Sequence, residues 1–274
     1  MRLTCSTRSA HPLLRLTALL LAGAAPAPLG AQYVPSAQAW EQRSPGQVGL
    51  DEGAVRAAVA FAVQNESTGL RDLLANHQRT FAREPHGEAV GPFKERGNAT
   101  GLIIRGGYIV AAWGDPDRVD VTFSVTKSFL STTVGLAFDR GLIRALDDSV
   151  RTYMAPVVPW PAQEVIEPFE SAHSRRITWD HLLRQTSDWE GTLWGKPDWA
   201  DRPRGDLVEW KARERHEPGT VYTYNDVRVN LLALAALNMW RQPLPQVLKE
   251  HVMDPIGASN TWRWYGYDSS WIVL

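Results

Sequence analysis

The pattern of apolar and polar positions predicts a helix followed by a β-hairpin in the first part of the chain. Residues 51–67 begin with Asp51, a residue type that caps helices, and then repeat apolar side chains at helical spacing: Val55, Val59 and Ala62. Residues 100–115 form two β-rich runs joined at Gly106-Gly107, a dipeptide that tolerates the positive φ of a tight hairpin turn. A helix followed by an antiparallel hairpin indicates an α+β fold rather than a parallel α/β fold.

The pattern changes to helices in the second part of the chain. Residues 124–141 carry apolar side chains around most of the helix circumference and end at Gly141, so we expect a helix that is buried in the middle of the protein. Residues 177–187 and 225–240 are two further helix candidates. Between them, residues 188–220 are rich in Trp, Pro and Asp, and this composition predicts a loop region. Six tryptophans fall between Trp160 and Trp210; we expect them to fill the helical part, and the alternative is that they line an acyl or sugar pocket.

The first 31 residues are typical of a secretory signal peptide. They contain arginines but no acid, then the apolar run LTALLLAGAA, and then a stretch of small residues. The apolar run is shorter than the roughly 20 residues that a membrane-spanning helix needs. We therefore expect cleavage after Ala31 and an exported protein, periplasmic or secreted, without a membrane anchor. Residues 32–48 mix Pro, Gly, Ser and Gln without apolar periodicity and predict a surface linker.

Composition narrows the range of partners. The 274 residues are 44% hydrophobic and 22% charged, which excludes a disordered chain, and a net charge of -1 offers no surface for nucleic acid. The one cysteine, Cys5, lies in the predicted signal peptide, and His181 and His251 lack a second histidine at metal-ligand spacing. No metal or organic cofactor is implied, and we expect the partner to be a small-molecule substrate.

Ser124 and Lys127, three residues apart at the start of the 124–141 helix, are candidates for nucleophilic catalysis. Residues at this spacing share one helix face, and a serine hydroxyl becomes a nucleophile when a base takes its proton. Burial and the positive end of the helix dipole both disfavour a charged lysine, so Lys127 can be that base. The same helix end directs backbone N–H groups at an oxyanion formed by Ser124. Alternatively, so short a motif occurs by chance, with a packing serine and a solvated lysine.

Four segments carry a family resemblance through their order in the chain. They are FSVTKSFLSTTVGLAFDRGLI, LDDSV, ITWDHLLRQTS and EPGTVYTYNDVRVNLLALA. Over residues 50–260 this order resembles the penicillin-binding and class C β-lactamase superfamily of serine hydrolases and esterases. The resemblance implies that Ser124 is the acylated nucleophile, that Lys127 is its partner, and that Tyr224 occupies the tyrosine position of the last motif.

The last motif departs from the family pattern at Asp226, where the family usually has asparagine. An ionised carboxylate only accepts hydrogen bonds and pairs naturally with Lys127, which would keep the lysine charged and favour Tyr224 as the base. Whether Lys127 or Tyr224 takes the proton stays open at this point. Asp226 and Asn225 are the candidate substrate-binding residues, and the acid argues against a β-lactam-type amide substrate. A second departure, TSD at 186–188 instead of TSG, is expected to alter a loop.

The resemblance also implies an architecture and a reaction. We expect an antiparallel sheet flanked by helices, with residues 49–123 as the N-terminal part of the α/β domain, residues 124–255 as a mostly helical domain carrying the active-site helix, and residues 256–274 as a truncated return toward the sheet. The implied function is a serine hydrolase that forms an acyl-enzyme on an ester or amide carbonyl. The alternatives are a D-alanyl peptidase or penicillin-binding protein, and a catalytically silent binding module on the same fold.

A third family motif, of the type Lys/His-Thr/Ser-Gly, does not occur between Asp226 and Leu274. The resemblance places this motif on a sheet strand that supplies an oxyanion donor. We therefore expect an incomplete member of the family with low activity, because the loss of one such donor slows the reaction. We also expect an incomplete sheet, in which the hairpin at 101–114 exposes an edge with unpaired N–H and C=O groups.

Overall fold

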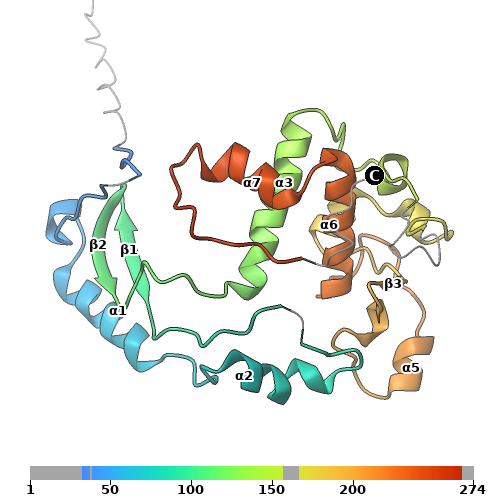
Figure 1. The fold of residues 1–274 in the computed structure, drawn as a ribbon, viewed down its shortest axis with the longest axis horizontal. Coiled ribbons are helices and arrows are strands. Elements are labelled where there is room, and N and C mark those ends of the chain that lie inside the picture. The colour runs from blue at the N-terminus through green and yellow to red at the C-terminus, as the bar shows by residue number, and fades with distance from the viewer. Residues whose placement is uncertain (1–32, 38, 90, 157–166, 267–274) are drawn as a thin grey trace, which may run out of the picture. The chain divides into compact units, whose positions relative to one another are not determined.

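The computed structural model describes residues 33–37, 39–89, 91–156 and 167–266 (Figure 1). The signal peptide predicted for residues 1–31 lies outside the described residues. Every described helix and strand belongs to one unit, Val34–Leu274. The elements are α1 (Glu52–Gln64), α2 (Leu73–Arg79), β1 (Gly101–Arg105), β2 (Tyr108–Trp113), η3 (Phe123–Val125), α3 (Thr126–Asp139), α4 (Trp179–Leu183), β3 (Thr192–Leu193), β4 (Lys196–Pro197), η6 (Asp198–Ala200), α5 (Leu207–Ala212), α6 (Asp226–Trp240), α7 (Leu244–Leu248) and several single-turn helices.

The first helix and the hairpin form as the sequence predicts. α1 begins after Asp51, whose carboxylate accepts a hydrogen bond from the Ala54 N–H at 2.6 Å. β1 and β2 pair antiparallel, and their turn holds Gly106 and Gly107 at φ of +59° and +88°, which glycine adopts without steric cost. Within the described residues this sheet has two strands. The α+β class and the incomplete sheet expected from the sequence are therefore confirmed.

Part of the segment that we expected to be a linker, residues 32–48, pairs with the hairpin. Ile109 of β2 donates its N–H to the Glu41 carbonyl and accepts a hydrogen bond from the Arg43 N–H, both at 3.0 Å. Backbone groups at the edge of a sheet need such partners. On the β2 side, the edge that we expected to be exposed is thus partly covered.

Burial of α3 is restricted to one side, so the expectation of a helix buried all round is wrong. Leu130, Val134 and Ala137 are at most 3% exposed, whereas Phe138 is 41% exposed. The buried positions repeat every three to four residues and form one stripe along the helix. That stripe packs against α6 and α7, and Phe138 lies outside it.

The main hydrophobic core lies where α3, α4, α6 and α7 pack together. Figure 1 shows α3, α6 and α7 side by side. α6 spans almost the whole predicted range 225–240 and buries Leu231 and Ala235 completely. Trp179 and Trp189 are at most 2% exposed and belong to this core, which is the packing role expected for the tryptophans between Trp160 and Trp210, whereas Trp194 lines a pocket, the alternative role. The packing holds α3 and α6 against each other, and these two helices carry Lys127 and Asp226. No helix in the described ranges is long and apolar enough to cross a bilayer.

Residues 188–220, which we predicted to be a loop, contain short elements and a buried charge cluster. β3, β4 and α5 are too short for a periodic pattern to reveal them. Arg228 of α6, 3% exposed, lies 2.7 Å from Asp188 and 3.0 Å from Asp198. Asp188 also accepts a hydrogen bond from Arg213 at 2.8 Å. The departure from TSG to TSD therefore ties this region to the helix that begins at the active site.

We expect Asp188→Ala to lower the free energy of unfolding by about 3 kcal/mol, because the buried Arg228 keeps Asp198 but loses one of its two carboxylate partners, and Arg213 loses the carboxylate to which it donates. Burial by itself would raise the pKa of Asp188, but these arginines hold it well below its ordinary value. Such a carboxylate stabilises the fold above its unfolded-state pKa of about 4 and loses this contribution as the pH falls. Urea unfolding of both proteins at about pH 7 and about pH 3 measures the effect. The difference should be smaller in acid, and an equal difference at both pH values would contradict the assignment.

Candidate active site

Ser124 lies in the single turn η3 directly before α3, and its side chain is exposed. Phe123, the preceding residue, has φ of +48°, a left-handed conformation that is uncommon for residues other than glycine. The N–H groups of Val125 and Thr126 donate to carbonyl oxygens in and next to this turn. The sequence predicted free N–H groups at this helix end, and for these two residues that prediction is wrong.

Lys127, in the first turn of α3, places its ammonium group between Ser124 and Asp226 and against the ring of Tyr224. Nζ lies 3.0 Å from Ser124 Oγ, 2.7 Å from Asp226 Oδ1 and 4.9 Å from the centroid of the Tyr224 ring. An ammonium only donates hydrogen bonds, so the serine hydroxyl and the carboxylate are suitable partners for it. Burial by itself would lower the pKa of Lys127, but the bonds to Asp226 and Tyr224 outweigh it and raise the pKa above its ordinary value. This direction agrees with the charged lysine that its pairing with Asp226 predicts, and the choice between Lys127 and Tyr224 as the base stays a prediction.

Tyr224 reaches Ser124 from the loop before α6. Its Oη lies 2.5 Å from Ser124 Oγ, although the two residues are 100 positions apart in the chain. Gln185 fixes this loop, because its carbonyl accepts a hydrogen bond from the Thr223 N–H and its side chain accepts one from the Asn225 N–H. Sequence reasoning did not single out Gln185. Gln185 belongs to the segment ITWDHLLRQTS, so its hydrogen bonds connect that segment to the loop that carries Tyr224.

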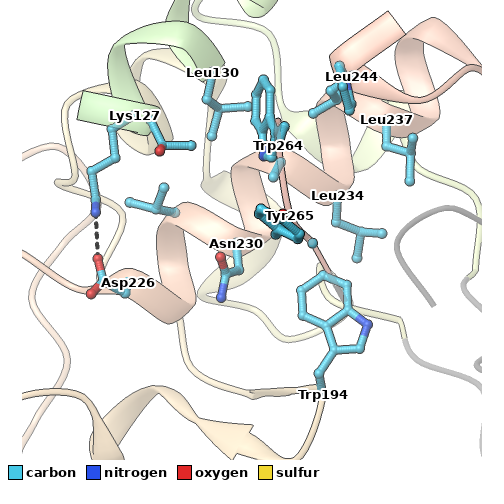
Figure 2. Close-up of a pocket in the computed structure, with 15 residues that line it drawn as sticks. Lys127, Leu130, Trp194, Asp226, Asn230, Leu234, Leu237, Leu244, Trp264 and Tyr265 are labelled. Carbon is cyan, nitrogen blue, oxygen red and sulfur yellow. Dashed lines mark ion pairs between the residues drawn. The ribbon is translucent and has the colours of Figure 1, made fainter. Parts of the chain in front are cut away.

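Asp226, the first residue of α6, is the negatively charged residue that contacts the lysine. Its Oδ1 pairs with Lys127 at 2.7 Å, and its Oδ2 accepts a hydrogen bond from Arg202 at 2.9 Å. The N–H of Asp226 donates to Asp201 at 2.6 Å. Burial by itself would raise the pKa of Asp226, but Lys127 and Arg202 lower it below its ordinary value. The Asp226–Lys127 pair expected from the sequence is present in the structure (Figure 2).

Asn225 is placed differently from the expectation that it binds substrate. The residue is 2% exposed, its Oδ1 accepts a hydrogen bond from the Arg228 N–H, and its Nδ2 donates to the Asp198 carbonyl. The first N–H groups of a helix lack partners within the helix, and an asparagine at the N-cap supplies one. Both ends of the Asn225 side chain are thus occupied by the protein, and Asp226 alone of the two faces the reactive groups.

Arg202 and Asp201 belong to the site, although no sequence motif contains them. Arg202 Nη1 lies 2.9 Å from both Asp201 Oδ2 and Asp226 Oδ2. Its guanidinium carbon lies 4.6 Å from the centroid of the Tyr224 ring. The sequence carries no signal for this contact, because the loop before α5 has neither a regular pattern nor a family motif.

An apolar pocket of about 250 Å³ opens beside Lys127 and Asp226 (Figure 2). α3, α6 and α7 form its walls together with the chain after α7. Its apolar lining includes Leu130, Trp194, Leu234, Leu237, Leu244, Trp264 and Tyr265. Of the candidate site residues, Lys127 and Asp226 line this pocket, so the pocket adjoins the pair that contacts Ser124. Among the described residues, no group of three or more His, Cys, Asp or Glu side chains forms a metal-ligand cluster.

Comparison with known proteins gives a family match. The family model described as Beta-lactamase matches residues 88–264. A solved structure entitled "EstCE1, a hydrolase with promiscuous acyltransferase activity" is 20% identical, with a TM-score of 0.36, over 57% of this chain and 45% of that one. A beta-lactamase/D-alanine carboxypeptidase from Yersinia pestis, complexed with citrate, is 19% identical, with a TM-score of 0.35, over 54% of this chain and 45% of that one. The chain spans less than half the length of either structure. No curated protein matches the sequence.

Proposed function

The chain belongs to the beta-lactamase family, and on this basis we propose that it is a serine hydrolase that forms an acyl-enzyme at Ser124. The observation that carries the proposal is the position of Ser124 Oγ, 2.5 Å from Tyr224 Oη and 3.0 Å from Lys127 Nζ. Both distances are within reach of a direct proton transfer or hydrogen bond. A nucleophile with a base and a cation at this range has the arrangement that covalent catalysis needs.

In the proposed acylation, Tyr224 reacts as the phenolate and Lys127 stays an ammonium. The Ser124 hydroxyl gives its proton to Tyr224 Oη while Oγ bonds to the substrate carbonyl carbon. The carbonyl oxygen becomes an oxyanion near the positive end of the α3 dipole. Tyr224 then returns the proton to the leaving alcohol or amine as its bond to carbon breaks. An ester of Ser124 remains.

Deacylation uses the same groups with water as the nucleophile. Water gives a proton to the Tyr224 phenolate and bonds to the acyl carbon, and the bond from that carbon to Ser124 Oγ breaks. The proton on Tyr224 passes to Oγ, so the serine hydroxyl and the phenolate are both restored. Lys127 holds the two oxygens in place and keeps its charge, because Asp226 pairs with it at 2.7 Å.

For the substrate we propose a small ester whose acyl or alcohol group is apolar. Such a group fits the pocket beside Lys127 and Asp226, which is lined mainly by leucine and aromatic side chains. An amide substrate also needs a donor for its carbonyl and an acceptor for its N–H. Asp226, which stands where the family usually has asparagine, is an acceptor only, and both of its oxygens are already bonded to cations. An ester suits this site better.

Two covalent probes test the function and its alternatives on the full chain. A fluorophosphonate labels an activated serine of an esterase, and a fluorescent penicillin labels a penicilloyl-type enzyme. Labelling by the fluorophosphonate alone supports the ester hydrolase. Labelling by the penicillin supports a D-alanyl peptidase or β-lactamase activity instead. If neither probe labels the protein, the proposal fails and a binding module remains.

We expect Asp226→Asn to raise the ratio of β-lactam to ester turnover by about tenfold. The amide of asparagine supplies the donor that the carboxylate lacks, and removal of the negative charge lets Lys127 lose its proton more readily. The kcat/KM values for a chromogenic cephalosporin and a p-nitrophenyl ester give this ratio. The matched change Asp254→Asn alters an exposed acid paired with Lys249, away from the site, and should leave the ratio unchanged. An unaltered ratio in Asp226→Asn would mean that this residue does not face the substrate.

We also propose that the protein is exported, with residues 1–31 as a signal peptide. The proposal is supported by the arginines, the apolar run and the small residues at the start of the sequence. Amino-terminal sequencing of the mature protein tests it. A mature chain that begins at Gln32 supports the proposal, and one that retains the preceding residues refutes it.

A further inference from the structure

We infer that Arg202 is a positioning residue of the site, which fixes the Asp226 carboxylate and places a second positive charge beside Tyr224. This inference rests on the proposed function and deepens it, because it adds a residue that lies outside the motif segments. Arg202 lies in the loop between η6 and α5, and it donates a hydrogen bond to Asp226, the first residue of α6.

The guanidinium of Arg202 is held in place from several sides. Nη1 donates to Asp226 Oδ2 and to both carboxylate oxygens of Asp201, each at 2.9 Å. The guanidinium carbon lies 4.6 Å from the ring centroid of Tyr224 and 5.4 Å from that of Phe81. Charged hydrogen bonds and contact with aromatic rings together leave the group few other positions. A cation is therefore fixed against the ring of the proposed base.

The backbone supports the same placement. Arg202 has φ of +51°, a left-handed conformation that is unfavourable for a residue other than glycine. Such a conformation persists where neighbouring contacts determine it. The neighbour here is Asp201, which is 3% exposed and accepts the N–H of Asp226 at 2.6 Å. Asp201 thus binds the backbone N–H of Asp226, the first residue of α6, while Arg202 binds its side chain.

The balance of charge explains why this arginine matters for the proposed base. The charged groups that face Tyr224 and Asp226, or contact those that do, come from several parts of the chain: Lys127, Lys196, Glu84, and the neighbours Asp201 and Arg202. Lys127 Nζ lies 4.9 Å from the Tyr224 ring centroid, so two cations contact this ring. If Arg202 is removed, Lys127 remains as the cation against the Tyr224 ring, and the carboxylates of Asp201 and Asp226 lose the arginine that they share. A net negative surrounding disfavours a phenolate.

The pH dependence of serine labelling tests this role directly. We would measure the rate at which a fluorophosphonate labels the full chain from about pH 6 to about pH 10. In Arg202→Met the labelling rate near pH 7 should fall about tenfold. The rise of the rate with pH should occur about one pH unit higher than in the wild type, so the rate recovers in alkaline buffer. Arg202→Lys keeps the charge without the planar fork and should recover part of the rate. The exposed neighbour Arg204 gives the matched control, and Arg204→Met should behave as wild type.

Each outcome decides the question. A fall in rate by the same factor at every pH, with the limb unmoved in Arg202→Met, would overturn the inference and leave Arg202 a structural role. Equal rates for Arg202→Met and wild type would overturn it as well. If the wild-type chain itself is not labelled, the proposed function fails and the inference fails with it. Thermal unfolding of the same variants separates a loss of folded protein from a change in reactivity.

Discussion

Ser124→Ala is expected to abolish covalent labelling by a fluorophosphonate while leaving the thermal unfolding midpoint nearly unchanged. The side chain is exposed and contributes little packing, but its oxygen is the atom that attacks the probe. Labelling forms the bond between Oγ and phosphorus, expels fluoride and needs a base for the serine proton. Removal of this oxygen leaves no acceptor for the phosphonyl group. Gel fluorescence of the labelled chain and a thermal melt measure the two quantities.

Two serines of α3 are the controls for this prediction. Ser131 donates its hydroxyl to the Ser128 carbonyl at 2.9 Å, and neither hydroxyl forms a hydrogen bond with Lys127 or Tyr224. Ser128→Ala and Ser131→Ala should therefore keep full labelling. Labelling that survives in Ser124→Ala would place the nucleophile elsewhere, with these two residues tested next. Labelling lost in all three variants would indicate that the helix itself has been disturbed.

Local signals in the sequence were sufficient for the elements that begin or turn on particular residues. Asp51 caps α1 because its carboxylate accepts a backbone N–H three residues on, a contact set by the local chain. Gly106 and Gly107 make the hairpin turn because both adopt positive φ. Such contacts span only a few residues, so they can be inferred without knowledge of the fold.

Predictions that depended on distant neighbours were less successful. The circumference of α3 is apolar in sequence, but only the stripe with Leu130 and Val134 has α6 and α7 to cover it. Likewise Asn225 and Asp226 are adjacent in sequence and both were expected to bind substrate. The N-cap geometry turns the first toward the helix backbone and leaves the second facing Lys127. The direction in which each of these two side chains points is set by the folded loop before α6, so it could not be inferred from the sequence.

For the site, the sequence singled out Ser124, Lys127 and Tyr224 but not the residues that surround them. The spacing of Ser124 and Lys127 places them on one helix turn, and the family resemblance added Tyr224 from a distant segment. Arg202 had no such signal, because its contact with Asp226 spans 24 residues through an irregular loop. It became visible only when the fold brought the two residues together.

The acid at position 226 is the basis for the proposed choice of base. Its carboxylate lies 2.7 Å from Lys127 Nζ and, together with Tyr224, raises the pKa of the lysine, which disfavours loss of the lysine proton. Arg202 pairs with the same carboxylate at 2.9 Å. In the proposed mechanism Tyr224 therefore takes the serine proton, because its Oη lies 2.5 Å from Ser124 Oγ.

Tyr224→Phe is accordingly expected to lower the acylation rate by about 10³-fold, within the range found for a positioned acid or base. Phenylalanine keeps the ring against Lys127 and Arg202 but removes the oxygen that lies 2.5 Å from Ser124 Oγ. The fold should be retained, because the ring and not the hydroxyl fills the space. Stopped-flow measurement of the acylation burst with a p-nitrophenyl ester gives the rate, and the amplitude of the burst reports the fraction of competent sites.

Tyr222→Phe is the matched control, since Tyr222 lies two residues earlier on the same loop and is 63% exposed. It should acylate at the wild-type rate. Lys127→Ala should lower the rate by at least about 10²-fold, because it removes the cation that holds both oxygens. The two site variants differ in alkali: the lysine variant keeps the phenolate and should regain rate at high pH, whereas Tyr224→Phe has no group to ionise and should stay slow. A near-normal rate in Tyr224→Phe, or recovery of that variant at high pH, would mean that another group takes the serine proton.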